Sequence, residues 1–196
     1  MTRPRIGLDF DDTLMPTREW IIARLNALHG TSKDPETLLD IFVSRFWGYS
    51  DAEFAAFFRQ NVDELHTLAP YAHCPDTLRA WAGQADLYII TGRSADWCQP
   101  LPGWLSRHGI VVQDVLPADR RPKGEIAAEL GIMLYVDDYG PHATSVADRR
   151  IPVLLLDRCY NRAVRHEGIR RLKDWREIGA VVHDECLLAP GPGGRG

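Results

Sequence analysis

The sequence predicts an α/β fold: a doubly wound parallel sheet with helices on both faces and a small helical cap inserted after the first strand. Two observations lead to this prediction. Short, almost continuously apolar runs alternate with segments of helical periodicity, as expected when strands are covered on both faces. Residues 15–75 interrupt this alternation, because they hold helical patterns without a convincing strand.

The predicted strands are short apolar runs, and helical segments connect them. In chain order, the strands cover residues 5–10, 86–90, 110–115, 132–136 and 151–156. The helices are expected at residues 95–108, 123–130, 141–147 and 172–182. Consecutive parallel strands need such crossover connections, so these elements define a core that is formed by residues 1–14 and 76–188.

The interrupting segment, residues 15–75, carries two amphipathic helix patterns. Ile21, Leu25 and Leu28 repeat at helical spacing, and a second pattern begins at Phe54, which predicts two helices that each have one apolar face. An insertion directly after the first strand of a parallel sheet lies over the carboxyl edge, where such folds bind ligands. We therefore expect this segment to form a helical cap above a binding site.

Length and composition indicate one soluble globular domain. The chain has 196 residues, of which 45% are hydrophobic and 26% charged, as is usual for such proteins. The formal net charge of −4 argues against a protein that coats nucleic acid or anionic membrane. The tail, residues 189–196, is mostly Gly and Pro and is expected to be disordered. With no apolar run of membrane-spanning length and no secretion-signal pattern, we expect a cytoplasmic protein with reduced cysteines: Cys74, Cys98, Cys159 and Cys186.

An acidic cluster follows the first predicted strand. Asp9, Asp11 and Asp12 lie within four residues, and such carboxylates repel each other unless a cation lies among them, so a hard divalent metal is the natural partner. The alternation of a strand puts Asp9 and Asp11 on one side, with Phe10 on the other. A polar turn that caps the next helix is the alternative interpretation.

Complementary groups follow other strands. Thr91 and Gly92 end the second strand, Lys123 opens a helix, and Asp137 and Asp138 end the fourth strand. Alone, each has a simpler explanation as a helix cap, a solvated side chain or a turn. A parallel sheet, however, brings these strand ends to one edge. There they would place acidic metal ligands beside a hydroxyl, a backbone amide and an ammonium group, which predicts a site for a phosphate group and its magnesium ion.

The set Asp9-Phe10-Asp11-Asp12-Thr13-Leu14, then Thr91, Lys123 and Asp137-Asp138, resembles the four ordered motifs of the haloacid dehalogenase superfamily. The resemblance spans residues 5–156. It implies that Asp9 is the nucleophile and Asp11 the general acid and base, and that Asp11 favours phosphoryl transfer, because dehalogenases lack this second aspartate. Asp12 stands where many relatives have glycine. The implied phosphate ligands are Thr91, Gly92 and Lys123, and the implied Mg²⁺ ligands are Asp9, Asp11, Asp137 and Asp138.

A finer resemblance concerns the branch of 5'(3')-deoxyribonucleotidase-like phosphatases. It rests on the size of the cap and on two stretches, residues 153–161 and 172–175; the chain departs from it at Thr91-Gly92-Arg93, where that branch often has Thr-Ser-Pro. The resemblance implies a Mg²⁺-dependent phosphomonoesterase that works through an aspartyl-phosphate on nucleoside 5'-monophosphates. The alternatives are a phosphatase of another small ester, of a polynucleotide end or of a protein, and a catalytically silent relative that only binds a ligand.

The expected partner is a small phosphorylated substrate rather than nucleic acid or a membrane. Aromatic residues of the cap could form its own core or could stack on a nucleobase. His142 is near Asp138 in the sequence and could approach the site, but is expected on a helix surface. The basic stretch of residues 158–173 could contact a polynucleotide backbone, but is expected to form a solvated face. The candidate substrate-binding residues are Trp47, Phe46, Arg45 and Arg93.

Overall fold

The structure is a computed structural model that describes residues 3–184 of the chain. Its centre is a six-stranded sheet in the order β3-β2-β1-β4-β5-β6, and all neighbouring strands are parallel. The predicted α/β fold with a doubly wound parallel sheet is therefore confirmed. The strands are β1 (Arg5–Leu8), β2 (Asp86–Thr91), β3 (Asp114–Pro117), β4 (Leu134–Asp137), β5 (Val153–Leu156) and β6 (Ile169–Leu172).

Two strands differ most from the prediction. Residues 110–113 do not belong to a strand, although the N–H of Gln113 donates to the carbonyl oxygen of Leu87 at 2.7 Å, and β3 covers Asp114–Pro117 rather than residues 110–115. The basic stretch predicted as a solvated face contains β6, whose sequence is Ile-Arg-Arg-Leu. An edge strand is covered less completely than a central one, so it does not need the continuous apolar run by which the other strands were predicted. The expectations for residues 189–196 and for Cys186 lie outside the described residues.

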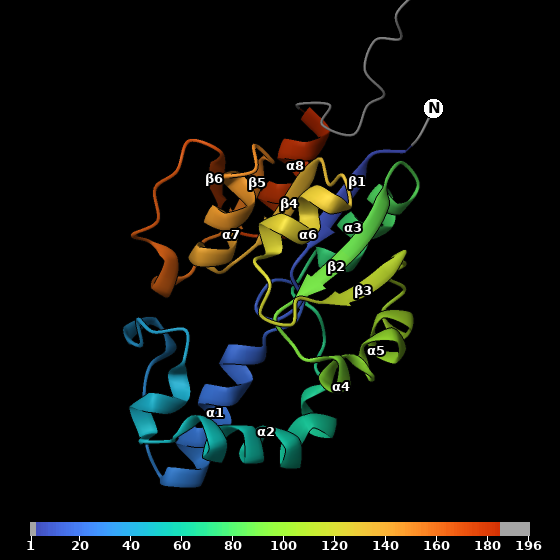
Figure 1. The fold of residues 1–196 in the computed structure, drawn as a ribbon. Helices are drawn as coiled ribbons and strands as arrows, with labels where there is room; N and C mark the ends of the chain where they lie inside the picture. Colours follow the sequence, from blue (N-terminus) through green and yellow to red (C-terminus); the bar gives the residue numbers. More distant parts are fainter. Residues whose placement is uncertain (1–2, 185–196) are drawn as a thin grey trace, which may run out of the picture.

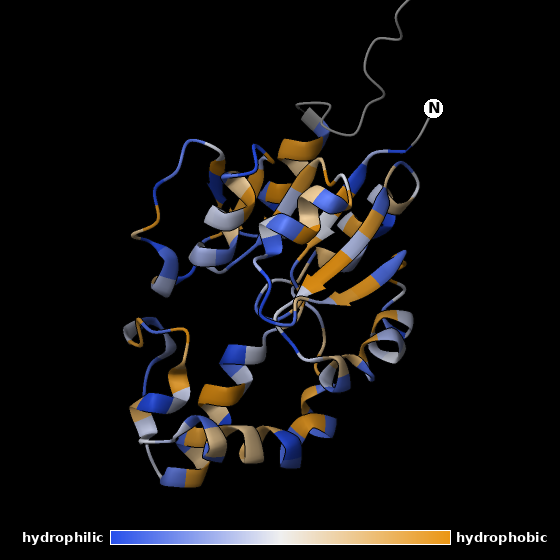
Figure 2. Cartoon of the chain, in the orientation of Figure 1, coloured by the Kyte–Doolittle hydropathy of each residue, from blue (hydrophilic) through white to orange (hydrophobic). Residues whose placement is uncertain are grey.

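Helices cover both faces of the sheet (Figure 1). One face packs against α3 (Cys74–Ala82), α5 (Leu101–Arg107) and α8 (Trp175–Asp184), and the other against α6 (Lys123–Glu129) and α7 (Gly140–Ala147). The predicted helix 95–108 is divided into α4 (Ala95–Cys98) and α5, because Pro100 lacks the N–H that would continue the helical hydrogen bonds. Figure 2 shows apolar residues along the strands and the faces of the helices that pack on them.

The residues of each central strand alternate between the two faces. In β1, Ile6 and Leu8 belong to the core on the α3 side, whereas Gly7 faces the α6 side. A Cβ atom on Gly7 would lie 2.3 Å from the ring of Tyr135 in β4, so the glycine makes room for this buried ring. The hydroxyl of Tyr135 donates to the carbonyl oxygen of Ile90, 3.0 Å away. This hydrogen bond connects β4 to β2 across β1, which lies between them.

The segment between β1 and α3 is helical, with α1 (Thr17–His29), η1 (Pro35–Thr37), η2 (Val43–Trp47) and α2 (Asp51–Leu65). These elements, which we call the insertion, lie beyond the carboxyl ends of the strands (Figure 1). They share a small core of their own, in which Ile22 and Leu25 of α1 pack with Phe57 of α2. The division of the chain into a core and a cap at residues 15–75 stays a prediction. Within residues 3–184 no helix is long and apolar enough to cross a membrane.

Candidate active site

The predicted motif residues meet at the carboxyl edge of the sheet. Asp9 directly follows β1, Thr91 and Asp137 are the last residues of β2 and β4, and Lys123 is the first residue of α6. All four side chains are buried. Topology alone explains the meeting, because β1 lies between β2 and β4 in the sheet and parallel strands end at the same edge.

Lys123 connects two buried carboxylates. Its Nζ lies 2.7 Å from Oδ1 of Asp9 and 3.3 Å from Oδ2 of Asp137, and its side chain is 1% exposed. Burial by itself would lower the pKa of Lys123, but the neighbouring carboxylates of Asp137 and Asp9 outweigh burial and raise it. The next residue, Gly124, lets the start of α6 approach α7, since a Cβ atom there would lie 1.9 Å from the carbonyl oxygen of Ser145. Lys123 is therefore a fixed ammonium group.

The two carboxylates carry more negative charge than Lys123 can neutralise. Burial, with Asp137 nearby, raises the pKa of Asp9 to about 6 although Lys123 acts in the opposite direction. Burial also raises the pKa of Asp137, even though its Oδ1 accepts hydrogen bonds from the backbone N–H groups of Asp138 and Tyr139 at 2.9 and 2.7 Å. A divalent cation beside these oxygens would favour the ionised forms, and carboxylate oxygens are the ligands that Mg²⁺ prefers. This donor set fits the predicted metal.

Asp138 has partners of its own. Its Oδ1 accepts a hydrogen bond from the hydroxyl of Thr13 at 2.8 Å, and its Oδ2 accepts one from the hydroxyl of Tyr160. The amide of Asn161 donates to its carbonyl oxygen at 2.6 Å. Burial and the neighbouring Asp12 raise the pKa of Asp138 well above its usual value. Both carboxylate oxygens of Asp138 are thus engaged with the protein, as are both carboxylate oxygens of Asp137.

Asp11 is held by an arginine. Nε and Nη2 of Arg93 donate to Oδ2 and Oδ1 of Asp11 at 2.8 and 2.7 Å, and the hydroxyl of Thr17 donates to Oδ1 as well. Burial would raise the pKa of Asp11, but the guanidinium of Arg93 and the hydrogen bonds outweigh it and lower the pKa. Arg93 is a candidate substrate-binding residue from the sequence; in the structure its guanidinium contacts Asp11 and the residue also lines the cavity described below, so its contact with a substrate stays a prediction.

The backbone conformation at Asp12 is one that suits glycine, the residue that many relatives have at this position. Asp12 has φ 56°, in the left-handed region that glycine adopts without strain and that Asp tolerates better than most residues. Its carboxylate accepts a hydrogen bond from the backbone N–H of Arg18 at 2.7 Å, and its carbonyl oxygen accepts one from Arg158 at 2.9 Å. The turn is therefore stabilised by Asp12 where many relatives use glycine.

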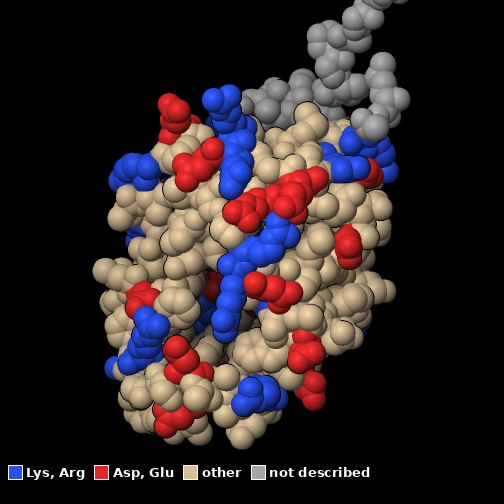
Figure 3. All heavy atoms as spheres, viewed as in Figure 1, with Lys and Arg blue, Asp and Glu red and all other residues tan. Residues whose placement is uncertain are grey.

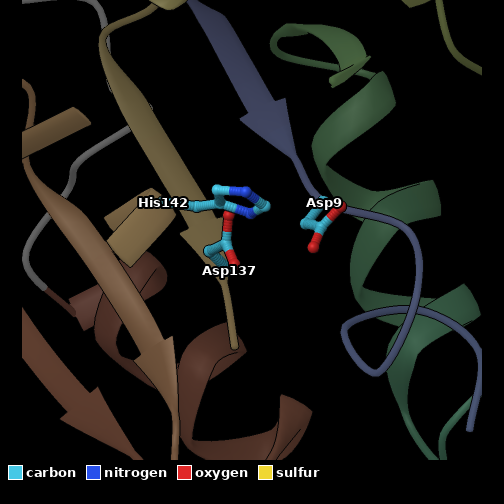
Figure 4. Close-up of side chains that lie close together, drawn as sticks. All are labelled: Asp9, Asp137 and His142. Carbon is cyan, nitrogen blue, oxygen red and sulfur yellow. The ribbon is translucent and has the colours of Figure 1, made fainter. Parts of the chain in front are cut away.

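His142 is a site residue that the sequence prediction misplaces. Asp9, Asp137 and His142 each offer one possible ligand atom, and these atoms lie within 4.8 Å of one another (Figure 4). The expected position on a helix surface is therefore wrong, because α7 begins directly after the strand end and its first turn faces the site. Burial lowers the pKa of His142 to about 4, so the imidazole is neutral at pH 7.

A cavity of about 560 Å³ opens above these groups, a size typical of small-molecule sites. The carboxylates of Asp9 and Asp11 lie at its polar end with the Gly92-Arg93-Ser94 turn. The insertion supplies much of its apolar wall, and Trp97 of α4 adds to it. The aromatic lining residues are Phe42, Phe54, Phe58, Trp97 and Tyr139.

Of the candidate substrate-binding residues, Arg93 lines this cavity, whereas Trp47, Phe46 and Arg45 do not. Trp47 does not line it; its indole N–H donates to the hydroxyl of Thr31 at 3.0 Å. Phe46 and Arg45 do not line it either, and Arg45 pairs with acidic residues of the insertion. In their place, Phe58 of α2 stacks on Trp97 with ring centroids 4.5 Å apart. Helical periodicity identifies Phe58 only as an apolar residue, so it could not reveal this contact with the core.

Comparisons with known proteins agree with this fold. Solved structures with the same architecture include a HAD-superfamily hydrolase, GSU2069, from Geobacter sulfurreducens, with TM-score 0.58, 18% identity and coverage of 92% of this chain and 96% of that chain. Another is YfnB from Bacillus subtilis, bound to magnesium, with TM-score 0.63, 12% identity and coverage of 93% and 100%. The chain therefore has the fold of HAD-superfamily hydrolases, in agreement with the resemblance of its sequence motifs.

Two curated proteins resemble the chain over nearly its whole length. One is "Putative nucleotidase BH1399" from Halalkalibacterium halodurans, 25% identical over 189 residues, which cover 95% of this chain and 96% of that protein. The other is "Nucleotidase CA_C3379" from Clostridium acetobutylicum, 20% identical over 183 residues, which cover 93% and 95%. No protein-family model matches the chain.

Proposed function

We propose that this protein is a Mg²⁺-dependent phosphomonoesterase that hydrolyses nucleoside 5'-monophosphates through an aspartyl-phosphate on Asp9. One observation carries the proposal. A buried carboxylate, Asp9, lies at the polar end of a substrate-sized cavity, 2.7 Å from the ammonium of Lys123 and beside the second carboxylate of Asp137. This arrangement supports the assignment of a nucleophile, a phosphate-binding cation and a metal ligand to one edge of the sheet.

The proposed reaction has two steps. In the first, a carboxylate oxygen of Asp9 forms a bond to phosphorus while the bond from phosphorus to the ester oxygen breaks, and Asp11 gives its proton to the leaving alkoxide. In the second, water attacks the phosphorus of the acyl phosphate, Asp11 takes a proton from that water, and Asp9 is released. Splitting the reaction in this way divides the very high barrier of phosphate monoester hydrolysis.

The phosphoryl oxygens need positive charge and hydrogen-bond donors during both steps. We assign these roles to the hydroxyl of Thr91, the backbone N–H of Gly92 and the ammonium of Lys123. Asp9, one or both of Asp137 and Asp138, and the carbonyl oxygen of Asp11 are the proposed metal ligands. The bound Mg²⁺ would neutralise charge on the phosphoryl oxygens.

Asp11 must be protonated to act as the acid, although Arg93 lowers its pKa in the ligand-free site. A phosphate dianion that binds beside Asp11 brings negative charge close to the carboxylate, and this raises its pKa. After the leaving group departs, Arg93 again favours the ionised form, which is the base that the second step requires. The ion pair thus favours the hydrolytic half of the cycle.

A nucleotide fits the remaining features of the site. The cavity joins a polar end to a wall of aromatic side chains from the insertion and α4, and a nucleobase stacked on one aromatic ring gains about 1–3 kcal/mol. Both curated relatives carry nucleotidase names. On the face shown in Figure 3, a run of basic side chains crosses the middle, but acidic side chains border it, so the face is not the uniformly basic surface that would favour a polynucleotide.

The direct test is a phosphate-release screen with Mg²⁺ over mononucleotides, sugar phosphates and 5'-phosphorylated oligonucleotides. We expect the highest kcat/KM for a mononucleotide, loss of activity in EDTA and recovery when Mg²⁺ is added back. Activity that is indifferent to EDTA would contradict the metal assignment. If sugar phosphates or oligonucleotide ends are the better substrates, the nucleotidase proposal fails while the phosphatase proposal stands.

Phe42→Ala tests the proposed base contact. Phe42 lines the cavity, yet its side chain is 52% exposed, so its removal should not unfold the protein. Loss of a stacking ring costs about 1–3 kcal/mol, so we expect kcat/KM for a mononucleotide to fall by about 5- to 150-fold. Ribose 5-phosphate should be hydrolysed almost as before.

The matched control is Phe46→Ala, which removes a similarly exposed ring that does not line the cavity. We expect Phe46→Ala to have the wild-type kcat/KM for both the mononucleotide and ribose 5-phosphate. An equal loss of activity toward the nucleotide and the sugar phosphate in Phe42→Ala would show that the ring has no role in base recognition.

A further inference from the structure

A buried chain of hydrogen bonds connects Asp11 to the end of α2. Two nitrogens of Arg93 hold the Asp11 carboxylate, and the third, Nη1, lies 2.8 Å from Nε2 of His66. The Arg93 side chain is 3% exposed and His66 is buried. The three residues come from separate parts of the chain: the turn after β1, the turn after β2, and the point where the insertion returns to the core.

The direction of the hydrogen bond between Arg93 and His66 is fixed by chemistry. A guanidinium can only donate, so Nε2 of His66 must accept, and the imidazole carries its proton on Nδ1. Among the described residues, Nδ1 has no hydrogen-bond partner. The imidazole is therefore linked to the active site through its hydrogen bond with Arg93.

The contact with His66 is the shorter of two that Nη1 of Arg93 makes. The guanidinium lies over the rings of Phe10 and Phe58, with distances of 4.9 and 5.7 Å to the centroids, and aromatic rings hold a cation without fixing its rotation in the plane. Two donors on Asp11 and Nη1, which lies 2.8 Å from His66 and 3.5 Å from the carbonyl oxygen of Trp97, define that rotation, because the guanidinium is planar and rigid.

The backbone places His66 at the junction between the insertion and the core. Its N–H donates to the carbonyl oxygen of Val62 in α2, 3.1 Å away. Its own carbonyl oxygen accepts a hydrogen bond from Nη2 of Arg107 in α5 at 2.8 Å. The imidazole thus keeps a position that both the insertion and the core determine.

We infer that His66 is a positioning residue: by accepting the hydrogen bond from Arg93, it fixes the guanidinium that orients the Asp11 carboxylate toward the substrate. The inference deepens the proposed function and rests on it, because it takes Asp11 as the acid and base. The end of α2 thereby sets the orientation of the Asp11 carboxylate, which belongs to the first motif.

Two substitutions separate the hydrogen bond from the volume of the side chain. His66→Leu removes the acceptor and keeps an apolar side chain of related size, whereas His66→Gln supplies an oxygen near the position of Nε2. We expect His66→Leu to lower kcat by about 10- to 100-fold, since small displacements of catalytic groups have effects of this size, with KM within about twofold. His66→Gln should recover most of kcat. The control His108→Leu, which removes a histidine next to Trp104, should leave kcat unchanged.

Wild-type kcat in His66→Leu, or equal losses in His66→Leu and His66→Gln, would overturn the inference. Crystal structures of the two variants give a readout that does not depend on activity. The guanidinium of Arg93 should leave Asp11 in His66→Leu and keep its contacts in His66→Gln; an unchanged guanidinium in His66→Leu overturns the inference even if no phosphatase substrate is found. Absence of phosphate release by the wild type would instead defeat the proposed function.

Discussion

Asp9→Asn is expected to abolish phosphate release, with a fall in kcat of about 10⁴-fold or more, as for the loss of an enzyme's nucleophile. The asparagine amide has nearly the same shape but cannot form an acyl phosphate, and it weakens one proposed metal ligand. It also removes the charge that faces Lys123 at 2.7 Å. The measurement is phosphate release at saturating Mg²⁺ with the best substrate from the screen.

The comparison variant is Asp11→Asn, which makes the same chemical change two residues later. It keeps the nucleophile and removes the proposed acid and base, so we expect substrate binding to persist while turnover slows by about 10²- to 10⁴-fold. Wild-type turnover in Asp9→Asn would eliminate the covalent mechanism. Wild-type turnover in Asp11→Asn would eliminate the role of Asp11 in proton transfer.

Lys123→Met is expected to have the largest effect on stability. It leaves the carboxylates of Asp9 and Asp137 buried without their ammonium partner, and removing one member of a buried ion pair costs about 3–5 kcal/mol. For a chain of this length, such a loss lowers Tm by about 6–20 °C. Thermal unfolding in EDTA measures this fall in Tm. Excess Mg²⁺ should raise the Tm of the variant part of the way back to the wild-type value, because a bound cation stabilises the folded state.

Lys173→Met is the control, because Lys173 is exposed and far along the chain from the site. We expect its Tm to equal that of the wild type with and without Mg²⁺. If Lys123→Met unfolds at the wild-type temperature in EDTA, then the buried carboxylates do not depend on the ammonium. The electrostatic account of the site would then be wrong, whatever the effect on activity.

Local patterns were sufficient for the central strands because burial on both faces demands apolar residues. Val153-Leu154-Leu155-Leu156 forms β5, within the strand predicted at residues 151–156. The edge strand β6 was not predicted, because it contains Arg170 and Arg171 and so lacks the continuous apolar run of the central strands. The helices of the insertion followed from periodicity, but their orientation relative to the core did not.

The sequence alone determined which backbone positions meet at the carboxyl edge. Asp9, Thr91 and Asp137 each end or follow a parallel strand, and right-handed crossover connections leave little choice about where those ends lie. The motifs therefore specify the chemistry of the site, with Lys123 at the start of a crossover helix. Their order along the chain was enough to predict a phosphate and metal site.

Only the tertiary structure decided the partners of these groups. The contacts of Arg93 with Asp11 and His66 join segments that are far apart along the chain. The aromatic wall depends on how α2 packs against α4, where Phe58 stacks on Trp97. Helical periodicity specifies which face of a helix is apolar and does not specify what that face meets. Those contacts follow from long-range packing, and through them the insertion shapes the cavity and fixes the carboxylate of Asp11.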